Sequence, residues 1–507
     1  MKSYLAPFIH LLLNFVHRKS FWVTYKNGVY DVTSFLPSHP GGDQIMNAGG
    51  YSIEPFWNVY GMHKTKEIYA LLESYRIGNL HEDDMVDLSD EELWVKEPIR
   101  DKRLIVKTSK PFNAEIPAKL QVAHFDTPNE LFYVRQHMPV PELDSSEHRV
   151  RVTIKNGQTV TREFSLQQLD KFPRTAVRAA LMCAGNRRSE MNELVRPFSG
   201  ILHPGLFAKN LSVDNNAMYP IINRYDNNLR FYFILNPKQV KPVKGISWQG
   251  GAISNAVWEG VLLIDVLKAC GLDDTSTAGK HVIFTGSDID ATGVNFSTSI
   301  PLEQALNPKN RILLATHMNG AVLPPDHGYP LRVIVPGAPA VRSVKWLESI
   351  TISKDESSSH WHQKDYRSFN ASKTWETADF ASAPPIYSLP VTSAICDPAH
   401  GDTVTAKNGV VEIRGYAYSG GGAKILRVDI SPDCGKTWVQ AEEMQSDDAP
   451  PQQHYAWTLW TARIPLELWA KATDSNFNTQ PERFNDIWNI RGVLSNAYHR
   501  IKVQIKH

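Results

Sequence analysis

The acidic run at residues 81–93, HEDDMVDLSDEEL, is the feature that most restricts how this chain can fold. Its carboxylates repel one another and it offers little apolar surface to bury, so it favours a solvated connection over a core element. The run separates residues 1–80 from a long remainder. Because 507 residues are too many for one hydrophobic core, we expect several domains, with residues 81–104 forming an acidic linker.

The acidic linker and a proline-containing stretch, SAPPIYSLPV, divide the chain into three parts. Each part has its own pattern of apolar residues. Residues 20–80 alternate strand-like and helical pieces, which predicts a small α+β unit. Residues 105–385 mix short strands, modest helices and many Gly and Pro turns, as is typical of a mixed α+β domain. After SAPPIYSLPV, residues 386–507 alternate with period two between turns, which predicts a β-sandwich. The expected fold class is α+β.

Charge and cysteine content exclude several classes of function. Lys plus Arg (54) nearly equal Asp plus Glu (53), so we expect no nucleic-acid partner and no membrane-coating role, and any charged site must be local. The four cysteines are scattered without C-x-x-C spacing, which argues against a disulfide framework and a zinc site. The apolar run at residues 4–16 is too short for a membrane span and has no small-residue cleavage site, so no targeting peptide is visible.

Two histidines in the first unit have the chemistry of haem ligands. His39 precedes a Pro-Gly-Gly turn in SHPGGDQIMNAGG, where Gly41 and Gly42 allow the backbone close to a flat ligand, and His63 follows in GMHKTKEI. Two neutral imidazoles on opposite faces hold iron for electron transfer with no open coordination position. From these residues alone, a turn histidine and a surface histidine remain an equal alternative.

The surrounding residues reduce that alternative. Together with VYDVTSF and YRIGNL, the HPGG motif resembles the cytochrome b5 family across residues 20–80. The resemblance implies a haem b with His39 and His63 as its axial ligands. Upstream, MKSYLAPFIHLLLNFVH differs from the first strand and short helix of the family.

One cysteine lies in a loop sequence with neighbouring cations. Cys183 begins CAGNRRSEMN and is followed by small residues and then by Arg187 and Arg188, whereas buried structural cysteines usually lie among Val, Leu and Ile. The two guanidinium groups would stabilise a thiolate or attract an anion. A free loop cysteine is the alternative that these residues leave open.

Five further motifs follow or precede this one in a fixed order: VRQHMPVP, VKGISWQGGAIS, DHGYPLRVIVPG, VRSVKWL and IWNIRGVLSNAYHR. With CAGNRR they resemble the sulfite oxidase family. The resemblance implies oxidation of sulfite to sulfate at a molybdenum–molybdopterin centre bonded by the Cys183 thiolate, a soft ligand that suits this metal. It also implies electron transfer, one electron at a time, through the haem to cytochrome c, a homodimer formed by an immunoglobulin-like domain at residues 386–507, and the mitochondrial intermembrane space.

The resemblance assigns roles to individual residues. Arg135, Arg188 and Arg491 would bind the sulfite dianion through guanidinium forks, with Lys244 as a weaker neighbour. Trp248 would form a wall of the pocket and Tyr366 would place a phenol near the reacting oxygen. The residues implied for the pterin cofactor are Tyr133, Val134, Arg135, Gln136, His137, Asp288, His327, Arg332, Arg342, Ser343, Val344 and Lys345. Relatives carry His where this chain has Ser343, so a backbone contact is expected there.

Residues 194–239 do not fit the family, which has no long insertion at this position. Their sequence has neither helical nor strand periodicity. A loop lid over the active site is one interpretation. We favour a retained intron, because Val195-Arg196 can be encoded by a donor-like GTAAGA, FYFIL by pyrimidine-rich codons and Gln239 by a terminal CAG.

Two other functions were compared with this interpretation. Assimilatory nitrate reductase also combines molybdenum and cytochrome b5 units, but there the haem follows the molybdenum domain and a flavin module follows the haem. A haem-only electron carrier with a dead molybdenum scaffold is the alternative from another class. The presence of Cys183, Arg188, Tyr366 and Arg491 together argues against it.

Overall fold

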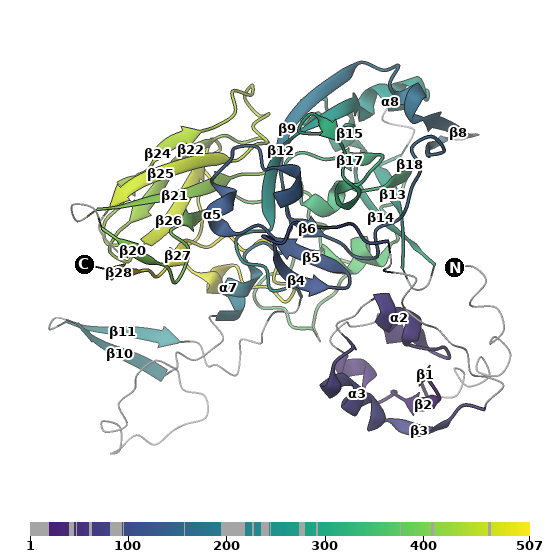
Figure 1. Ribbon diagram of the computed structural model, residues 1–507, viewed down its shortest axis with the longest axis horizontal. Coiled ribbons are helices and arrows are strands. Elements are labelled where there is room, and N and C mark those ends of the chain that lie inside the picture. The colour runs from purple at the N-terminus through teal and green to yellow at the C-terminus, as the bar shows by residue number, and fades with distance from the viewer. Residues whose placement is uncertain are drawn as a thin grey trace.

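A computed structural model of the chain contains a small N-terminal unit, a large central domain and a C-terminal pair of sheets (Figure 1). No helix in the described part of the chain is both long enough and apolar enough to cross a membrane. The structure describes residues 20–39, 45–46, 48–59, 63–81, 94, 96–156, 158–193, 219–225, 228–234, 243, 245–272, 279–290, 293–375, 377–406, 410–464 and 468–506.

The N-terminal unit is a small antiparallel sheet with two helices. Its strands pair in the order β1-β2-β3, and its core includes Val23, Trp57 and Leu72. Thr65 caps the second helix, because its side chain accepts a hydrogen bond from the N–H of Ile68. The elements are β1 (Trp22–Tyr25), β2 (Gly28–Asp31), α2 (Glu54–Val59), α3 (Lys66–Glu73) and β3 (Arg76–Asn79).

The central domain is built on two sheets of five strands and one of three. In the first sheet β12 pairs antiparallel with β9, from Ile253 opposite Met182 to Val261 opposite Arg174, so β9 ends in the interior directly before Cys183. The first sheet holds β9 (Arg174–Met182), β12 (Ile253–Leu262), β15 (Leu313–Met318), β16 (Ala321–Val322) and β17 (Arg332–Ile334). The second holds β7 (Arg149–Asn156), β8 (Gln158–Ser165), β13 (His281–Ile289), β14 (Asn295–Pro301) and β18 (Leu347–Ser353).

Short elements complete the domain. The three-stranded sheet consists of β4 (Ile105–Ser109), β5 (Phe112–Glu115) and β6 (Val134–Arg135). The helices are α5 (Ala118–Gln121), α6 (Leu166–Leu169), α7 (Arg188–Glu193), α8 (Leu263–Ala269) and α10 (Leu302–Leu306). α8 buries Leu263, Val266 and Leu267 on one face.

The C-terminal domain places two antiparallel sheets of four strands around one core. Ile413 and Trp460 from one sheet share that core with Ile430 and Ala470 from the other, as the predicted sandwich requires. The strands of the first sheet are β19 (Thr392–Asp397), β21 (Val411–Tyr418), β24 (Glu442–Gln445) and β25 (Thr458–Ile464). Those of the second are β22 (Ile425–Ser431), β23 (Val439–Gln440), β26 (Leu468–Asp474) and β27 (His499–Ile501). A parallel pair, β20 (Thr403–Thr405) and β28 (Gln504–Lys506), adds to them.

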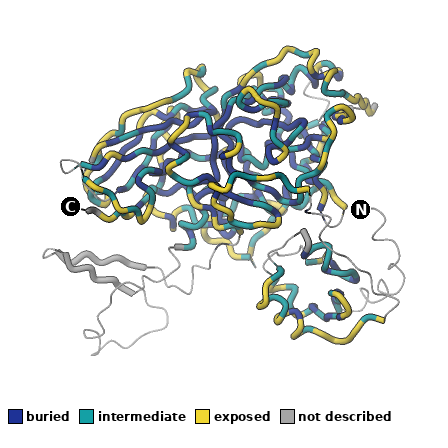
Figure 2. The backbone as a smooth tube through the Cα atoms, viewed as in Figure 1, coloured by how far each residue is buried: buried dark blue, intermediate teal, exposed yellow. Residues whose placement is uncertain are grey.

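The central and C-terminal domains share buried surface. Met182 and Ile253 of the central sheet lie in one apolar cluster with Tyr416 and Trp457 of the C-terminal domain. Figure 2 shows buried segments running through both domains. The strand end that carries Cys183 is therefore fixed from two sides.

Residues 192 and 243 lie next to each other, on either side of the predicted insertion. The N–H of Val243 donates to Oδ1 of Asn192 at 2.8 Å, and Nδ2 of Asn192 donates to the carbonyl of Val243 at 3.4 Å. Met191 and Val243 also share a small core with Phe484 and Ala497. The chain therefore leaves and re-enters the central domain at one point.

Within the insertion, the expectation of no regular structure is wrong for two backbone segments. These are β10 (Tyr219–Tyr225) and β11 (Asn228–Ile234), which pair antiparallel. β-branched and aromatic residues on both sides of a short polar stretch favour a hairpin even without strict alternation. Among the described strands, β10 and β11 pair only with each other. Residues 194–218 and 235–239 lie outside the described part of the chain.

His499 on β27 gives the domain junction a dependence on pH. Its Nδ1 accepts from the N–H of Ile395 at 3.1 Å, and its Nε2 lies 3.9 Å from Glu190. Burial lowers the pKa of His499 to about 4. The unfolded chain therefore binds a proton between pH 6.5 and 4 that the folded chain does not, so stability should fall by about 2–3 kcal/mol on acidification through this range.

This prediction is checked with His499→Gln, whose side chain does not titrate. The free energy of unfolding, measured in urea from pH 7 to pH 4, should fall less steeply for the variant than for the parent chain. An identical pH dependence in the two proteins would contradict the assignment of the effect to His499.

Candidate active site

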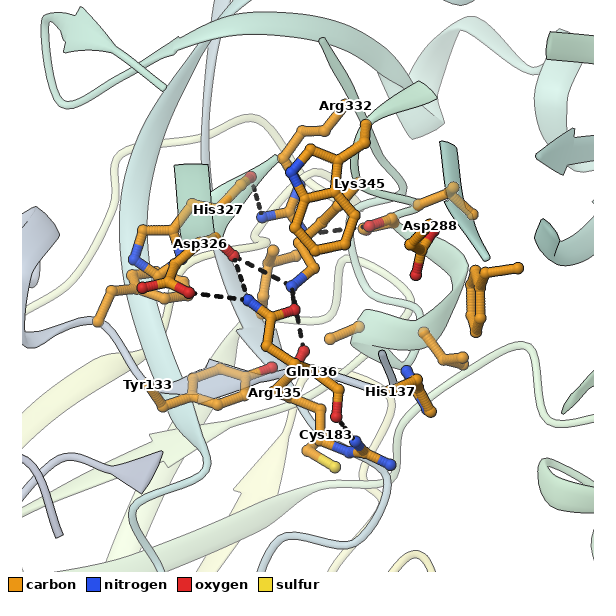
Figure 3. A pocket seen from close by; sticks show the side chains of 18 of the residues that line it. Tyr133, Arg135, Gln136, His137, Cys183, Asp288, Asp326, His327, Arg332 and Lys345 are labelled. Carbon is orange, nitrogen blue, oxygen red and sulfur yellow. Dashed lines mark hydrogen bonds between the residues drawn. The ribbon is translucent and has the colours of Figure 1, made fainter. Parts of the chain in front are cut away.

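A cavity lies in the central domain beside the end of β9. About 670 Å³ of it is not filled by protein atoms, and part of this space is open to solvent. Figure 3 shows polar side chains from β6, from the turn before β17 and from the segment before β18 pointing into it around Cys183. The lining residues that the sequence predicted are Tyr133, Arg135, Gln136, His137, Cys183, Asp288, His327, Arg332, Ser343, Val344, Lys345 and Tyr366.

Cys183 lies at the bottom of this cavity, where β9 ends and a turn leads into α7. Its N–H donates to the carbonyl of Ala252 at 2.9 Å, and its carbonyl accepts from the N–H of Asn186 at 2.9 Å. Oδ1 of Asn186 accepts from the N–H of Ala252 at 3.0 Å, which ties the turn to β12. The thiol is thus held in a fixed place, buried but lining the cavity.

A buried hydrogen-bonded group forms one wall. Lys345 donates to the carbonyls of Arg135 at 3.1 Å and Asp326 at 3.0 Å, and also to Oε1 of Gln136. Nε2 of Gln136 donates to Oδ1 of Asp326 at 3.0 Å. Asp326 is in turn paired with Arg100 through two hydrogen bonds of 2.9 and 2.8 Å. The negative charge of Asp326 is therefore neutralised from behind the wall.

Two buried polar atoms in the cavity wall have no protein partner within the described residues. They are Oδ1 of Asp288 and Nε of Arg332, on side chains that are 5% and 4% exposed at the residue level. Burial raises the pKa of Asp288 to about 7 and lowers that of Lys345 to about 7. Orphaned buried groups are costly, so this wall fits a ligand that supplies both donors and acceptors.

The charge of the wall fits an anionic cofactor. Arg135, Arg332 and Lys345 contribute cations, while Asp288 is the remaining carboxyl once Asp326 is paired with Arg100. In the described part of the chain, no group of three His, Cys, Asp or Glu side chains could hold a metal ion alone.

Tyr366 lines the same cavity. Its hydroxyl lies 3.2 Å from Nε2 of His137, and the ring of His137 stacks on Phe296 at a centroid distance of 5.0 Å. Burial raises the pKa of Tyr366 to about 12, and burial also lowers the pKa of His137 well below its usual value. The pair is therefore neutral near pH 7, and one hydrogen bond joins the hydroxyl of Tyr366 to Nε2 of His137.

Arg188 is held in place by two backbone carbonyls. Nε donates to the carbonyl of Gly492 at 2.9 Å, and Nη1 to that of Ile246 at 2.9 Å. Glycines leave room for it, since a Cβ on Gly185 or Gly245 would lie 2.6 or 2.7 Å from a guanidinium nitrogen. Burial lowers the pKa of Arg188 to about 10, and the neighbouring Arg491 guanidinium adds to this effect.

Arg491 approaches the same region from the C-terminal domain. Its Nη2 donates to Oδ1 of Asp365 at 2.7 Å, and its Nε to the carbonyl of Asp365 at 3.1 Å. Trp248 is fully buried in the core that also contains Cys183. The structure thus brings the predicted substrate residues together, although Arg188, Arg491 and Trp248 do not line the cavity itself.

Three other predicted residues are placed differently. The side chain of Arg342 turns away from the cavity and donates twice to the carbonyl of Ile386, at 3.1 and 3.0 Å. Val134 on β6 is buried in a small core with Leu104 and Ala114 and does not line the cavity. Ser343 does line it, but its hydroxyl accepts from the N–H of Val335 at 2.9 Å. Lys244 lies outside the described residues.

The sequence analysis missed Asp326 and its partner Arg100. Asp326 directly precedes the predicted His327, so a charged neighbour of a motif residue was the available signal. Arg100 is 226 residues away from it in the sequence and carries no motif, so only the fold brings the two together.

The two histidines of the N-terminal unit face each other. Their ring centroids are 6.2 Å apart and their planes differ by 10°. Two imidazoles on opposite sides of one iron, each about 2.0 Å from the metal through a ring nitrogen, have centroids roughly 6 Å apart. His39 and His63 therefore fit a six-coordinate haem iron. Gly41 and Gly42 lie outside the described residues.

Three family descriptions match successive parts of the chain. Residues 12–81 match "Cytochrome b5-like Heme/Steroid binding domain". Residues 137–211 and 233–361 match "Oxidoreductase molybdopterin binding domain", with a gap inside the predicted insertion. Residues 383–506 match "Mo-co oxidoreductase dimerisation domain".

Whole proteins give the same assignment. The chain is 43% identical to the mitochondrial sulfite oxidase of Drosophila melanogaster over 96% of its own length and 78% of that protein. It is 41% identical to the sulfite oxidase of Gallus gallus over 94% of its length and 95% of that protein. The sulfane dehydrogenase SoxCD of Paracoccus pantotrophus shares the fold, with a TM-score of 0.54 at 20% identity over 83% of this chain and 92% of that one.

Proposed function

The chain belongs to the sulfite oxidase family. We propose that sulfite is oxidised in the cavity beside Cys183 and that the motif residues around this cavity bind the substrate and the cofactor. The activity is the oxidation of sulfite to sulfate at a molybdopterin-bound molybdenum centre, in a protein that also has a cytochrome b5-type haem domain. The molybdenum cofactor supplies the two-electron oxygen-atom transfer. Water provides the oxygen, and two protons and two electrons leave.

In this proposal Cys183 bonds molybdenum through its thiolate, which the turn after β9 holds in place. Arg135, Arg188 and Arg491 attract the sulfite dianion and orient its oxygens, because guanidinium groups keep their charge even when buried. Tyr366 provides a hydroxyl hydrogen bond to the reacting oxygen, and its contact with His137 sets where that hydroxyl lies. Trp248 excludes water behind the cysteine.

The wall with orphaned polar atoms holds the pterin. Arg332, Lys345 and Asp288 would provide the donors and acceptors for this anionic cofactor. The backbone of residues 133–137 and of Ser343, Val344 and Lys345 completes the site, while His327 lines it as a neutral ring, since burial lowers its pKa to about 4. Arg342 contributes through its backbone alone.

His39 and His63 would hold the haem, which would supply one-electron transfer to cytochrome c. The acidic linker at residues 81–104 favours such a basic partner by charge. The other parts of the proposal are domain limits at residues 80, 104 and 385, an immunoglobulin-like topology for the dimerisation domain, a homodimer formed by that domain, and a mitochondrial location in the intermembrane space.

Gly185→Ala tests the role of Arg188. The added methyl group displaces the far end of a flexible side chain, so we expect the KM for sulfite to rise about tenfold while the melting temperature changes little. Gly250→Ala is the matched control, because a Cβ at position 250 would lie 3.7 Å from the Cβ of Ala394, an ordinary van der Waals distance. Equal KM values for the two variants would contradict the role of Arg188 in substrate binding.

The observation that carries the proposal is the position of a buried, cavity-lining thiol beside an anion-binding wall. The test is sulfite-dependent reduction of the haem by the chain lacking residues 194–239. Because Asn192 and Val243 already touch, this form should fold and bind both cofactors. A full load of molybdenum and haem without haem reduction would defeat the proposal, and haem without molybdenum would favour the electron-carrier alternative.

The same comparison addresses the origin of the insertion. If the chain with residues 194–239 binds little molybdenum while the shortened chain binds it fully, the retained-intron interpretation is favoured over an active-site lid. Transcript reads that pass directly from Glu193 or Leu194 to Val240 would establish it.

A further inference from the structure

A buried polar network lies behind the cavity wall and is centred on His362. This residue is fully buried in η9 (Trp361–Asp365), the turn that leads into Tyr366. Its Nε2 lies 2.6 Å from Oε2 of Glu356, and its Nδ1 lies 2.6 Å from Nη1 of Arg342. His362 therefore joins a buried cation to a carboxylate.

The protonation state of His362 follows from its partners. A guanidinium group can only donate, so Nδ1 of His362 accepts from Arg342, and it also accepts from the N–H of Ser299 at 3.3 Å. The ring proton is then on Nε2 and is donated to Glu356. Burial and the charge of Arg342 lower the pKa of His362 to about 4, which keeps the ring neutral.

The network extends to the residue after the active-site tyrosine. Nη2 of Arg367 lies 3.1 Å from Oε2 of Glu356, and its Nε donates to the carbonyl of His362 at 3.2 Å. Nη1 of Arg367 donates to the carbonyl of Ala383 at 2.9 Å. The turn is thus bound at both ends, by His362 before Tyr366 and by Arg367 after it.

Ile386 connects the two sides of the network. Its N–H donates to the carbonyl of Tyr366 at 3.0 Å, while its own carbonyl accepts both hydrogen bonds from Arg342 described above. Arg342 ends η8 (Ala340–Arg342), and Ala340 lines the cavity. One contiguous set of hydrogen bonds therefore links the cavity wall to the backbone of Tyr366.

We infer that His362, Arg342 and Glu356 are positioning residues that fix the phenol of Tyr366 relative to the cavity wall. This inference rests on the role proposed for Tyr366. None of the three touches the reacting atoms. Their hydrogen bonds hold the turn that carries Tyr366 in one conformation. This matters because a displacement of about 1 Å at a reacting group costs up to roughly 100-fold in rate.

The first test compares two substitutions at His362. His362→Leu keeps the volume and removes the hydrogen bonds, so kcat should fall about tenfold while KM for sulfite changes by less than about twofold. His362→Gln can accept from Arg342 and donate to Glu356, so it should restore most of kcat. Equal kcat values for the parent and His362→Leu would overturn the inference.

A double-mutant cycle separates positioning from a general effect on the fold. In the Tyr366→Phe background, His362→Leu should cause no further fall in kcat, because the hydroxyl that it positions is gone. The same fall in both backgrounds would overturn the inference. If Tyr366→Phe itself leaves kcat unchanged, the role proposed for Tyr366 fails instead.

Amide hydrogen exchange gives a measurement independent of turnover. The Ile386 amide should exchange about tenfold faster in His362→Leu than in the parent or in His362→Gln, because its bond to Tyr366 opens more often. Molybdenum content per chain should be equal in all three proteins. Unchanged exchange, or a loss of molybdenum in proportion to the loss of rate, would overturn the inference.

Discussion

Replacing Cys183 with serine is expected to abolish sulfite oxidation. The substitution exchanges one atom in a turn that backbone hydrogen bonds and β12 hold rigidly, so the fold should persist. A serine hydroxyl is a hard and weakly acidic ligand, whereas the thiolate is soft and suits molybdenum beside a dithiolene. The loss of kcat should exceed the roughly 100-fold that removal of a supporting residue costs at a metal site.

The measurement is kcat with sulfite, together with molybdenum per chain. Cys270→Ser is the matched control, because Cys270 is a buried free thiol in the other core of the central domain. Cys270→Ser introduces the same buried hydroxyl. Its kcat, calculated per folded protein, should equal that of the parent chain. A Cys183→Ser protein that oxidises sulfite at the parent rate would contradict the assignment of the metal ligand.

Replacing His63 with alanine should stop electron transfer through the haem and leave sulfite oxidation at the molybdenum domain intact. Without one of the two facing imidazoles the haem loses a ligand, so haem content and the reduction of a one-electron protein acceptor should fall at least about 100-fold. The cavity around Cys183 is in another domain and is unchanged. Sulfite oxidation with a small dye that accepts electrons at the molybdenum domain should therefore continue at the parent rate.

Absorbance of the reduced haem and the two acceptor assays check this prediction. His81→Ala is the control, since His81 is an exposed histidine just after β3. It should keep both activities. Full reduction of the protein acceptor by His63→Ala would show that electrons bypass this haem.

The sequence predicted the parts of the site that one short motif carries. Cys183 lies among loop residues rather than in an apolar run, and His39 directly precedes a Pro-Gly-Gly turn, so both could be chosen as candidates from their neighbours. The period-two alternation also predicted the two packed sheets of the C-terminal domain. Short motifs report local chemistry well because a turn, a ligand and its neighbours occupy adjacent positions.

The direction of each side chain could not be predicted in this way. Arg342 and Arg332 occupy equally plausible motif positions, yet Arg332 lines the cavity and Arg342 turns to the carbonyl of Ile386. The pairing of Asp326 with Arg100 likewise depends on segments that meet only after folding. These arrangements follow from packing between distant elements, which a linear pattern does not contain.

The closure of the chain at Asn192 and Val243 also has a practical use. A second protein inserted between Asn192 and Val243 would be attached at two neighbouring points. Its insertion would therefore not force the strands of the central domain apart. A fluorescent reporter or an electron-accepting enzyme whose own termini are close together could be carried there. This position is therefore a suitable insertion site on the central domain for chimeric sulfite sensors.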